Sequence, residues 1–162
     1  MNKPALFLSL LLPTVAARAA DLVPVKQVSL ELAAEIAMKS VEACRTDGFN
    51  VSAVVLDRAG RVQAALRDTL AAPYSLEIAE RKAGMALMSG TPSGDFRMAR
   101  GDIRPELNHI GGLIVMEGGQ PIRAAGSLVG AVGVSGAPGG DKDDVCARAA
   151  LKAVEERLEF AD

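Results

Sequence analysis

The chain has 162 residues, a formal net charge of −2 and few aromatic residues, with four phenylalanines, one tyrosine and no tryptophan. This length predicts a single domain, and a hydrophobic fraction of 49% is enough to build a buried core. The acidic balance and the scarce aromatic side chains argue against nucleic-acid binding, which needs a basic surface or aromatic rings on which bases stack.

The N-terminus has the pattern of a secretory signal peptide. Lys3 precedes an apolar segment from Ala5 to Val15, and Ala17-Arg18-Ala19 fits a cleavage site of the small-x-small type. This segment is shorter than the roughly 20 residues of a membrane-spanning helix, which disfavours the alternative of an uncleaved anchor. We therefore expect a signal peptide over residues 1–19 and a soluble periplasmic domain over residues 20–162, without membrane association after cleavage.

The rest of the chain alternates between helical and strand patterns. Ser29 is a favourable N-cap, and Gly48 lies where a left-handed residue commonly ends a helix. Asp57 to Gly60 predicts a hairpin turn, while Ser75 and Asp141 are the expected caps of two later helices. The predicted helices cover residues 30–47, 76–88, 95–100 and 141–160, and the predicted strands cover residues 50–56, 61–67, 113–116, 121–124 and 128–135.

These elements predict an α+β fold with a five-stranded, mostly antiparallel sheet and helices packed on it. The expected order is helix, two strands, helix, long loop, three strands and helix. The long loop covers residues 90–105 and includes the short helix. Because loops of this length in a compact domain usually serve a function or are mobile, we expect the loop to matter for binding.

The centre of the predicted sheet is a glycine-rich stretch from Gly118 to Gly140. Its strand over residues 128–135 has almost no polar atom, which is typical of a strand covered on both faces. Gly130 and Gly133 lie inside this strand, where glycine weakens a sheet unless something packs close to the backbone. The favoured interpretation is a helix lying tightly across the sheet. The alternative is a flat ligand or a partner subunit.

The two cysteines are Cys44, near the end of the first helix, and Cys146, near the start of the last. Two buried free thiols are the default expectation. An oxidising compartment permits a disulfide if the two helices run side by side, but sequence spacing does not give the distance between them.

Three segments together carry a family resemblance. They are VVLDRAGRVQAALR, SLEIAERKAGMAL and GGQPIRAAGSLVGAVGVSGA, the last followed by Asp141 and a closing helix. Over roughly residues 28–160 the chain resembles the GlcG/HbpS-like family, a haem-binding or "haem-degrading" domain also found at the C-terminus of PduO-type proteins. The resemblance implies a layered fold, binding of haem or another tetrapyrrole, and oligomers, in some members outside the cytoplasm beside redox-sensing systems.

His109 is the only histidine in the sequence, and it lies in the segment ELNHIGG. Imidazole is a common ligand of haem iron, so His109 is the candidate axial and metal ligand. A loop histidine bonded to backbone or solvent is the alternative. Glu106 lies three residues earlier, and the two side chains form a candidate acid and base if this segment is helical.

Several cations are candidates for holding carboxylate groups such as haem propionates or an organic acid. Arg97, Arg100 and Arg104 cluster in the long loop, and arginine binds carboxylates with two parallel hydrogen bonds. Arg67 ends a predicted strand, and Lys82 intrudes on the apolar face of the second helix. Arg67, Lys82, Arg100 and Arg104 are therefore predicted to bind the cofactor together with His109. Solvated surface charges are the alternative.

The sequence is compatible with three functions. The favoured one is an exported haem-binding or haem-responsive protein, accessory to a redox-sensing or oxidation pathway. The second is an enzyme acting on a carboxylated or oxidised metabolite in a pocket near His109. The third is a non-catalytic oligomeric accessory protein. A homo-oligomer is expected in each case, because a glycine-rich apolar sheet in a small domain favours symmetric assembly.

Overall fold

The computed structural model describes residue 21 and residues 23–160. The expected signal peptide over residues 1–19 lies outside the described residues. Among the described helices, none is both long and apolar enough to cross a membrane. The elements are, in chain order, α1 (Leu30–Thr46), β1 (Ser52–Asp57), β2 (Val62–Arg67), α2 (Ser75–Ser89), α3 (Ser93–Ala99), η1 (Gly101–Ile103), α4 (Arg104–Leu107), β3 (Gly119–Ala124), β4 (Ser127–Ser135), α5 (Gly140–Ala153) and α6 (Glu155–Glu159).

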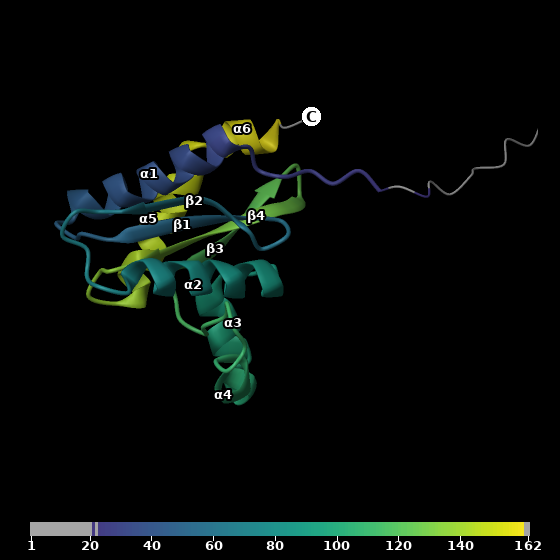
Figure 1. Cartoon of the computed structure of the whole chain (residues 1–162). Helices are drawn as coiled ribbons and strands as arrows, with labels where there is room; N and C mark the ends of the chain where they lie inside the picture. Colours follow the sequence, from purple (N-terminus) through teal and green to yellow (C-terminus); the bar gives the residue numbers. More distant parts are fainter. Residues whose placement is uncertain (1–20, 22, 161–162) are drawn as a thin grey trace, which may run out of the picture.

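The strands form one antiparallel sheet in the order β2-β1-β4-β3, with helices on both faces (Figure 1). The larger apolar core lies between the sheet and the pair α1 and α5, and it includes Ile36, Val55 and Val132. A smaller core lies under α2 and contains Val54, Leu56 and four alanines. The predicted α+β fold with helices packed on an antiparallel sheet is therefore confirmed.

Local signals set several ends of these elements, as the sequence predicts. Ser29 caps α1, and its Oγ accepts a hydrogen bond from the Leu32 N–H at 3.2 Å. Gly48 has a φ of 79° directly after α1. The turn between β1 and β2 is closed by Asp57, whose Oδ1 accepts from the Arg61 N–H at 2.9 Å. These contacts join neighbours in sequence, which explains why the sequence alone reveals them.

The caps predicted for α2 and α5 are wrong. Ser75 and Asp141 lie inside the first turns of these helices, and the cap positions are Tyr74 and Gly139, neither with a side-chain cap hydrogen bond. The Ser75 hydroxyl is buried and donates to the Ala72 carbonyl at 2.7 Å. The hydroxyl also bonds to Ser52 of β1 at 2.9 Å, so both of its contacts lie outside the helix and Ser75 takes the first helical position instead of the cap.

The sheet has four strands and not the predicted five. Residues 113–116 form no strand, because their backbone bonds run to α2 and to a side chain. The Ile114 N–H donates to the Arg81 carbonyl at 3.2 Å, and the Val115 N–H donates to Asn108 Oδ1 at 2.9 Å. This apolar segment therefore packs along α2 instead of extending the sheet.

The helices differ from the prediction in two further places. The region after α2 is mostly helical, since η1 and α4 follow α3. Together they form a projection on the α2 side that points away from the sheet, and we call residues 93–110 the arm (Figure 1). The last predicted helix divides into α5 and α6 at Val154, where φ is −117° and ψ is 11°.

Helix α2 lies directly against the backbone of β3 and β4. Gly119 and Gly133 are paired across these strands. A Cβ at Gly133 would lie 1.9 Å from the Ala79 carbonyl oxygen, and one at Gly119 would lie 2.1 Å from the Lys82 carbonyl oxygen. The interpretation of Gly133 as a place of tight helix packing is therefore confirmed. The Cβ at Gly130 would instead meet a carbonyl of the neighbouring strand.

The Gly133→Ala substitution is expected to destabilise the protein by about 3 kcal/mol, because its Cβ would push against helix backbone that cannot rotate away. Denaturant unfolding of the purified variant measures this loss. Gly111→Ala is the matched control, since a Cβ there meets nothing within 4 Å and the backbone φ is not positive. Equal stability of the two variants would contradict this account of the packing.

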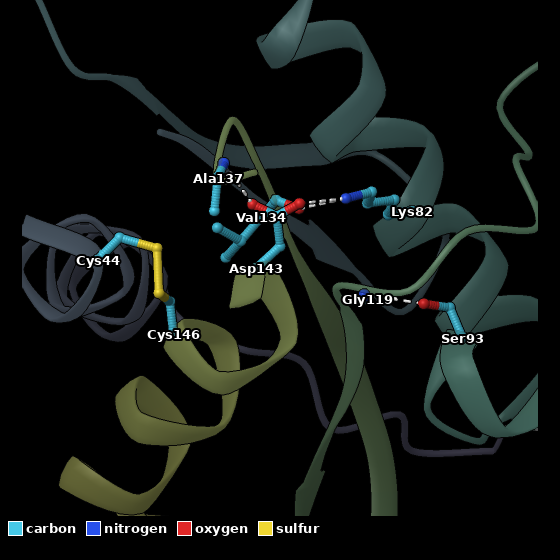
Figure 2. A network of polar contacts seen from close by, with 8 residues as sticks. All are labelled: Cys44, Lys82, Ser93, Gly119, Val134, Ala137, Asp143 and Cys146. Carbon is cyan, nitrogen blue, oxygen red and sulfur yellow. Dashed lines mark hydrogen bonds and ion pairs between the residues drawn. A yellow bond between two sulfur atoms is a disulfide. The ribbon is translucent and has the colours of Figure 1, made fainter. Parts of the chain in front are cut away.

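Cys44 and Cys146 form a disulfide that links α1 to α5, with their Cα atoms 5.4 Å apart (Figure 2). The default expectation of two free thiols is therefore wrong. Both residues are buried in the larger core. The bond closes a loop with a sequence separation of 102 residues, and it ties the start of α5 to the end of α1.

Replacing both cysteines by serine is expected to lower the free energy of unfolding by about 2–5 kcal/mol, because the unfolded chain regains the entropy that this long loop removes. The melting temperature of the oxidised protein, compared with that of the reduced protein and of the double variant, tests this. A reductant that lowers the melting temperature of the native protein and leaves that of the double variant unchanged would identify the disulfide as the cause.

Candidate functional site

A buried ion pair joins the two sides of the sheet. The Lys82 Nζ of α2 lies 2.7 Å from Asp143 Oδ2 of α5, and it also donates to the Val134 carbonyl at 3.0 Å (Figure 2). Both side chains are almost completely buried. Charges in such a position need both a partner and hydrogen bonds, because their desolvation is costly.

The Asp143 carboxylate is held on both of its oxygens. Its Oδ1 accepts from the Ala137 N–H at 3.0 Å while Oδ2 faces Lys82 (Figure 2). Burial raises the pKa of the Asp143 carboxyl, and the Lys82 charge and the hydrogen bonds act against this rise. The pair thus fixes the loop after β4 to the beginning of α5.

A cavity of about 330 Å³ lies beside this pair, and both Lys82 and Asp143 line it. The other walls come from the start of α2, from Met116 and from the glycine-rich loop between β4 and α5. Ser135 at the end of β4 also lines the cavity, and its side chain is buried. Its hydroxyl makes no hydrogen bond to the described residues, and because none of their fully enclosed side-chain oxygens lacks a partner, this oxygen is open to the cavity. The cavity therefore combines small apolar walls with a few polar groups, which is the usual composition of a ligand pocket.

The arm carries four of the predicted site residues. Arg100, Arg104, Glu106 and His109 are all exposed there. Arg100 pairs with the neighbouring Asp102 at 3.0 Å, and its guanidinium lowers the pKa of that carboxyl. The structure therefore brings these residues together on one projecting segment. Their roles, including Glu106 and His109 as acid and base, stay predictions.

The other two predicted site residues lie outside the arm. Lys82 is inside the domain, where Asp143 and a carbonyl occupy two of its hydrogen bonds. Arg67 ends β2, and its guanidinium donates to the Ala71 carbonyl. Arg97, the third arginine of the predicted cluster, pairs with Glu117 at 2.9 Å. In the described part of the chain, no group of three or more histidine, cysteine or acidic side chains is arranged to hold a metal ion.

Sequence reasoning missed Asp143 and Ser135. The signal available for the first was Lys82 on an apolar helix face, because a buried lysine requires an acidic partner. Nothing in the sequence selects Asp143 from the other acids in DKDD, 61 residues away. Ser135 ends the predicted strand over residues 128–135, and its surroundings lack the G-x-S-x-G pattern that would mark a nucleophile.

The fold and the buried pair define a class of small, layered α+β domains with a glycine-rich turn before the last helix. The chain belongs to the HbpS-like family, because the family model for haem degrading protein HbpS-like matches residues 28–152. No curated protein matches the chain.

Solved structures agree with this assignment. The chain is 39% identical to HbpS, with a TM-score of 0.77, over 86% of this chain and 99% of that one. It is 38% identical to a double mutant of HbpS from Streptomyces reticuli, with a TM-score of 0.76, over 88% and 97%. A complex of PduOC with heme is similar in fold, with a TM-score of 0.69 and 22% identity, over 78% and 94%.

The Lys82→Met substitution is expected to cost about 3–5 kcal/mol at neutral pH, because it leaves the Asp143 carboxylate buried without its counter-ion. Removing Lys82 also removes the influence that holds down the already raised pKa of Asp143. A group with a raised pKa in the folded state contributes stability at low pH and loses it as the pH rises. The loss in Lys82→Met should therefore be smallest below about pH 3.9 and grow toward pH 7.

Denaturant unfolding at several pH values measures this dependence. The double variant Lys82→Met, Asp143→Asn is the control, since the amide carries no charge at any pH and keeps an oxygen for the Ala137 N–H. A penalty for Lys82→Met that does not change with pH would show that lost packing, and not the stranded carboxylate, causes the loss.

Proposed function

We propose that the mature protein binds haem outside the cytoplasm, with His109 as an axial ligand of the iron. Membership of the HbpS-like family supports a haem-related role. The observation that carries the site is the arm itself, where the only histidine of the sequence is exposed on the same segment as Arg100 and Arg104. Haem needs both kinds of group, a nitrogen ligand for iron and cations for its propionates.

The chemistry of the arm fits haem, but one chain does not enclose it. Met98 and Ile110 are 80% and 50% exposed, so the arm that carries His109 also carries exposed apolar surface. His109 does not line the cavity described above, nor the larger hollow between β3 and α5 near Arg123 and Arg148. We propose that a second copy of the chain covers the haem, which also accounts for the exposed apolar side chains of the arm.

The remaining parts of the proposal concern location and role. Export rests on the signal-peptide pattern over residues 1–19. Bound haem supplies an iron whose ligand sphere and redox state respond to the surroundings. The chain itself would hold the iron through His109 and orient the propionates through Arg100 and Arg104. We further propose an accessory role in a redox-sensing or oxidation pathway, which an iron with these properties would support.

Titration of the mature protein with haemin is expected to give a saturable Soret shift, which His109→Ala abolishes because no other imidazole is present in the sequence. Arg104→Gln should keep the band and weaken haemin binding by about tenfold, because it removes a charged hydrogen-bond donor. Light scattering during the titration shows whether haem-bound protein is dimeric or larger.

Met98→Leu is the matched control, because it keeps an apolar side chain on the arm and removes the exposed thioether, which is another possible iron ligand. Its Soret band should be unchanged. A band that survives in His109→Ala and disappears in Met98→Leu would assign the ligand to Met98. Equal, unsaturable binding by all the variants would reject a specific haem site on the arm.

A further inference from the structure

Lys82, which lines the cavity, has a hydrogen-bond donor that no described residue uses. An ammonium group has three N–H donors. In the structure Lys82 uses two of them, toward Asp143 and the Val134 carbonyl. Because Lys82 lines the cavity, its charge and its remaining donor lie at the cavity wall, while only 1% of the residue is exposed to bulk water.

Ser135 supplies a second donor in the same cavity. Only 6% of this residue is exposed, yet its hydroxyl makes no hydrogen bond to the described residues. Among the described residues no fully enclosed side-chain nitrogen or oxygen lacks a partner, so the Ser135 oxygen is in contact with the space of the cavity. Ser135 is paired with Ser52 on β1, whose hydroxyl is already bonded to Ser75 at 2.9 Å. The Ser135 hydroxyl is therefore able to bond to a ligand atom in the cavity.

The start of α5 adds further donors. Gly139 and Gly140 line the cavity, and their N–H groups have no acceptor among the described residues. They lie at the N-terminus of a 14-residue helix, where the aligned peptide dipoles favour negative charge. The nearest buried acid, Asp143, already has both oxygens occupied, by Lys82 and by the Ala137 N–H. Asp141 also lies near this end, and its exposed carboxylate opposes an anion.

From this geometry we propose that the cavity binds the carboxylate of a small organic acid. The donors of Lys82, Ser135 and the start of α5 call for acceptor oxygens. The Ser75 hydroxyl also lines the cavity but is already bonded to Ser52 and to the Ala72 carbonyl. Apolar wall comes from Ala72, Pro73, Ile78, Met116 and Pro138. A volume of about 330 Å³ lies at the low end of the range for ligand pockets, so the acid is a short one with an apolar tail.

A carboxylate could come from a free acid or from a haem propionate. We assign the cavity to the free acid, because His109 does not line it and the site is complete within one chain. The two sources are separated by measuring haemin binding on the same variants. The proposal does not depend on haem binding by the arm, since neither His109 nor an arginine takes part in it.

The test is a titration of the ¹⁵N-labelled mature protein with butyrate and benzoate by NMR, with butanol and benzyl alcohol as uncharged counterparts. Either acid should give saturable shifts of the amides of Gly136, Gly139 and Gly140, and the alcohols should not. Ser135→Ala should weaken binding of the acid by about tenfold, because it removes one hydrogen bond to a charged group. Haemin binding by this variant should equal that of the native protein.

Ser127→Ala is the matched control, because it makes the same change at the other end of β4, outside the cavity. It should bind the acid as the native protein does. Ala72→Leu, which places a larger side chain on the cavity wall, should reduce binding and serves as a second variant if Ser135→Ala proves unstable. The proposal is overturned by shifts that never saturate, by equal affinity in all variants, or by a Ser135→Ala defect confined to haemin.

Discussion

The contact between α2 and the paired glycines of β3 and β4 is the constraint on which the rest of the structure depends. Gly119 and Gly133 leave no side chain between the sheet and the helix, so carbonyl groups of α2 lie directly over strand backbone. A second glycine contact lies on the outer side of α2, where a Cβ at Gly84 would be 2.2 Å from the Gly112 carbonyl oxygen. The helix is thus held between two backbone surfaces, and its position has little freedom.

This position sets the environment of Lys82. Its carbonyl lies over Gly119, while its side chain reaches Asp143 on the helix that covers the opposite face (Figure 2). Three residues after Asp143, Cys146 links the same helix to α1. The start of α5 is therefore fixed by an ion pair to one layer and by a covalent bond to the other. The rigid loop before it, with Ser135 at its base, is the wall of a preformed cavity.

Sequence patterns predicted the features that depend on contacts between residues close together in the chain. The cap at Ser29 and the turn at Asp57 depend on residues a few positions apart, and both are found in the structure. The prediction of a strand at residues 113–116 was wrong, because an apolar run does not reveal whether its backbone will bond to a strand or to α2. Motifs spread along the chain revealed the family, which the family model confirms.

The candidate site was harder to predict, because its polar groups come from distant elements. Lys82 was selected for its place on an apolar stripe, but its partner lies in another helix and Ser135 gives no signal of its own. The arm residues were found because they are neighbours in sequence and have the chemistry of a haem site. Their exposure, however, is a property of the fold, and no pattern in ELNHIGG distinguishes an exposed histidine from a buried one.

The two candidate sites make different demands on the molecule. The cavity gathers its donors from α2, β4 and α5 of a single chain, all held by the glycine contact, the ion pair and the disulfide. Binding there needs no rearrangement and no second copy, so its affinity should not depend on protein concentration. The arm offers an imidazole for the iron and cations for the propionates, but no cavity around them. Any haem bound by His109 therefore keeps much of its apolar surface in water until another protein surface covers it. Haem affinity at the arm must therefore rise with the concentration of the protein itself. Assembly of several chains, and not the fold of one chain, then controls how tightly the arm binds haem.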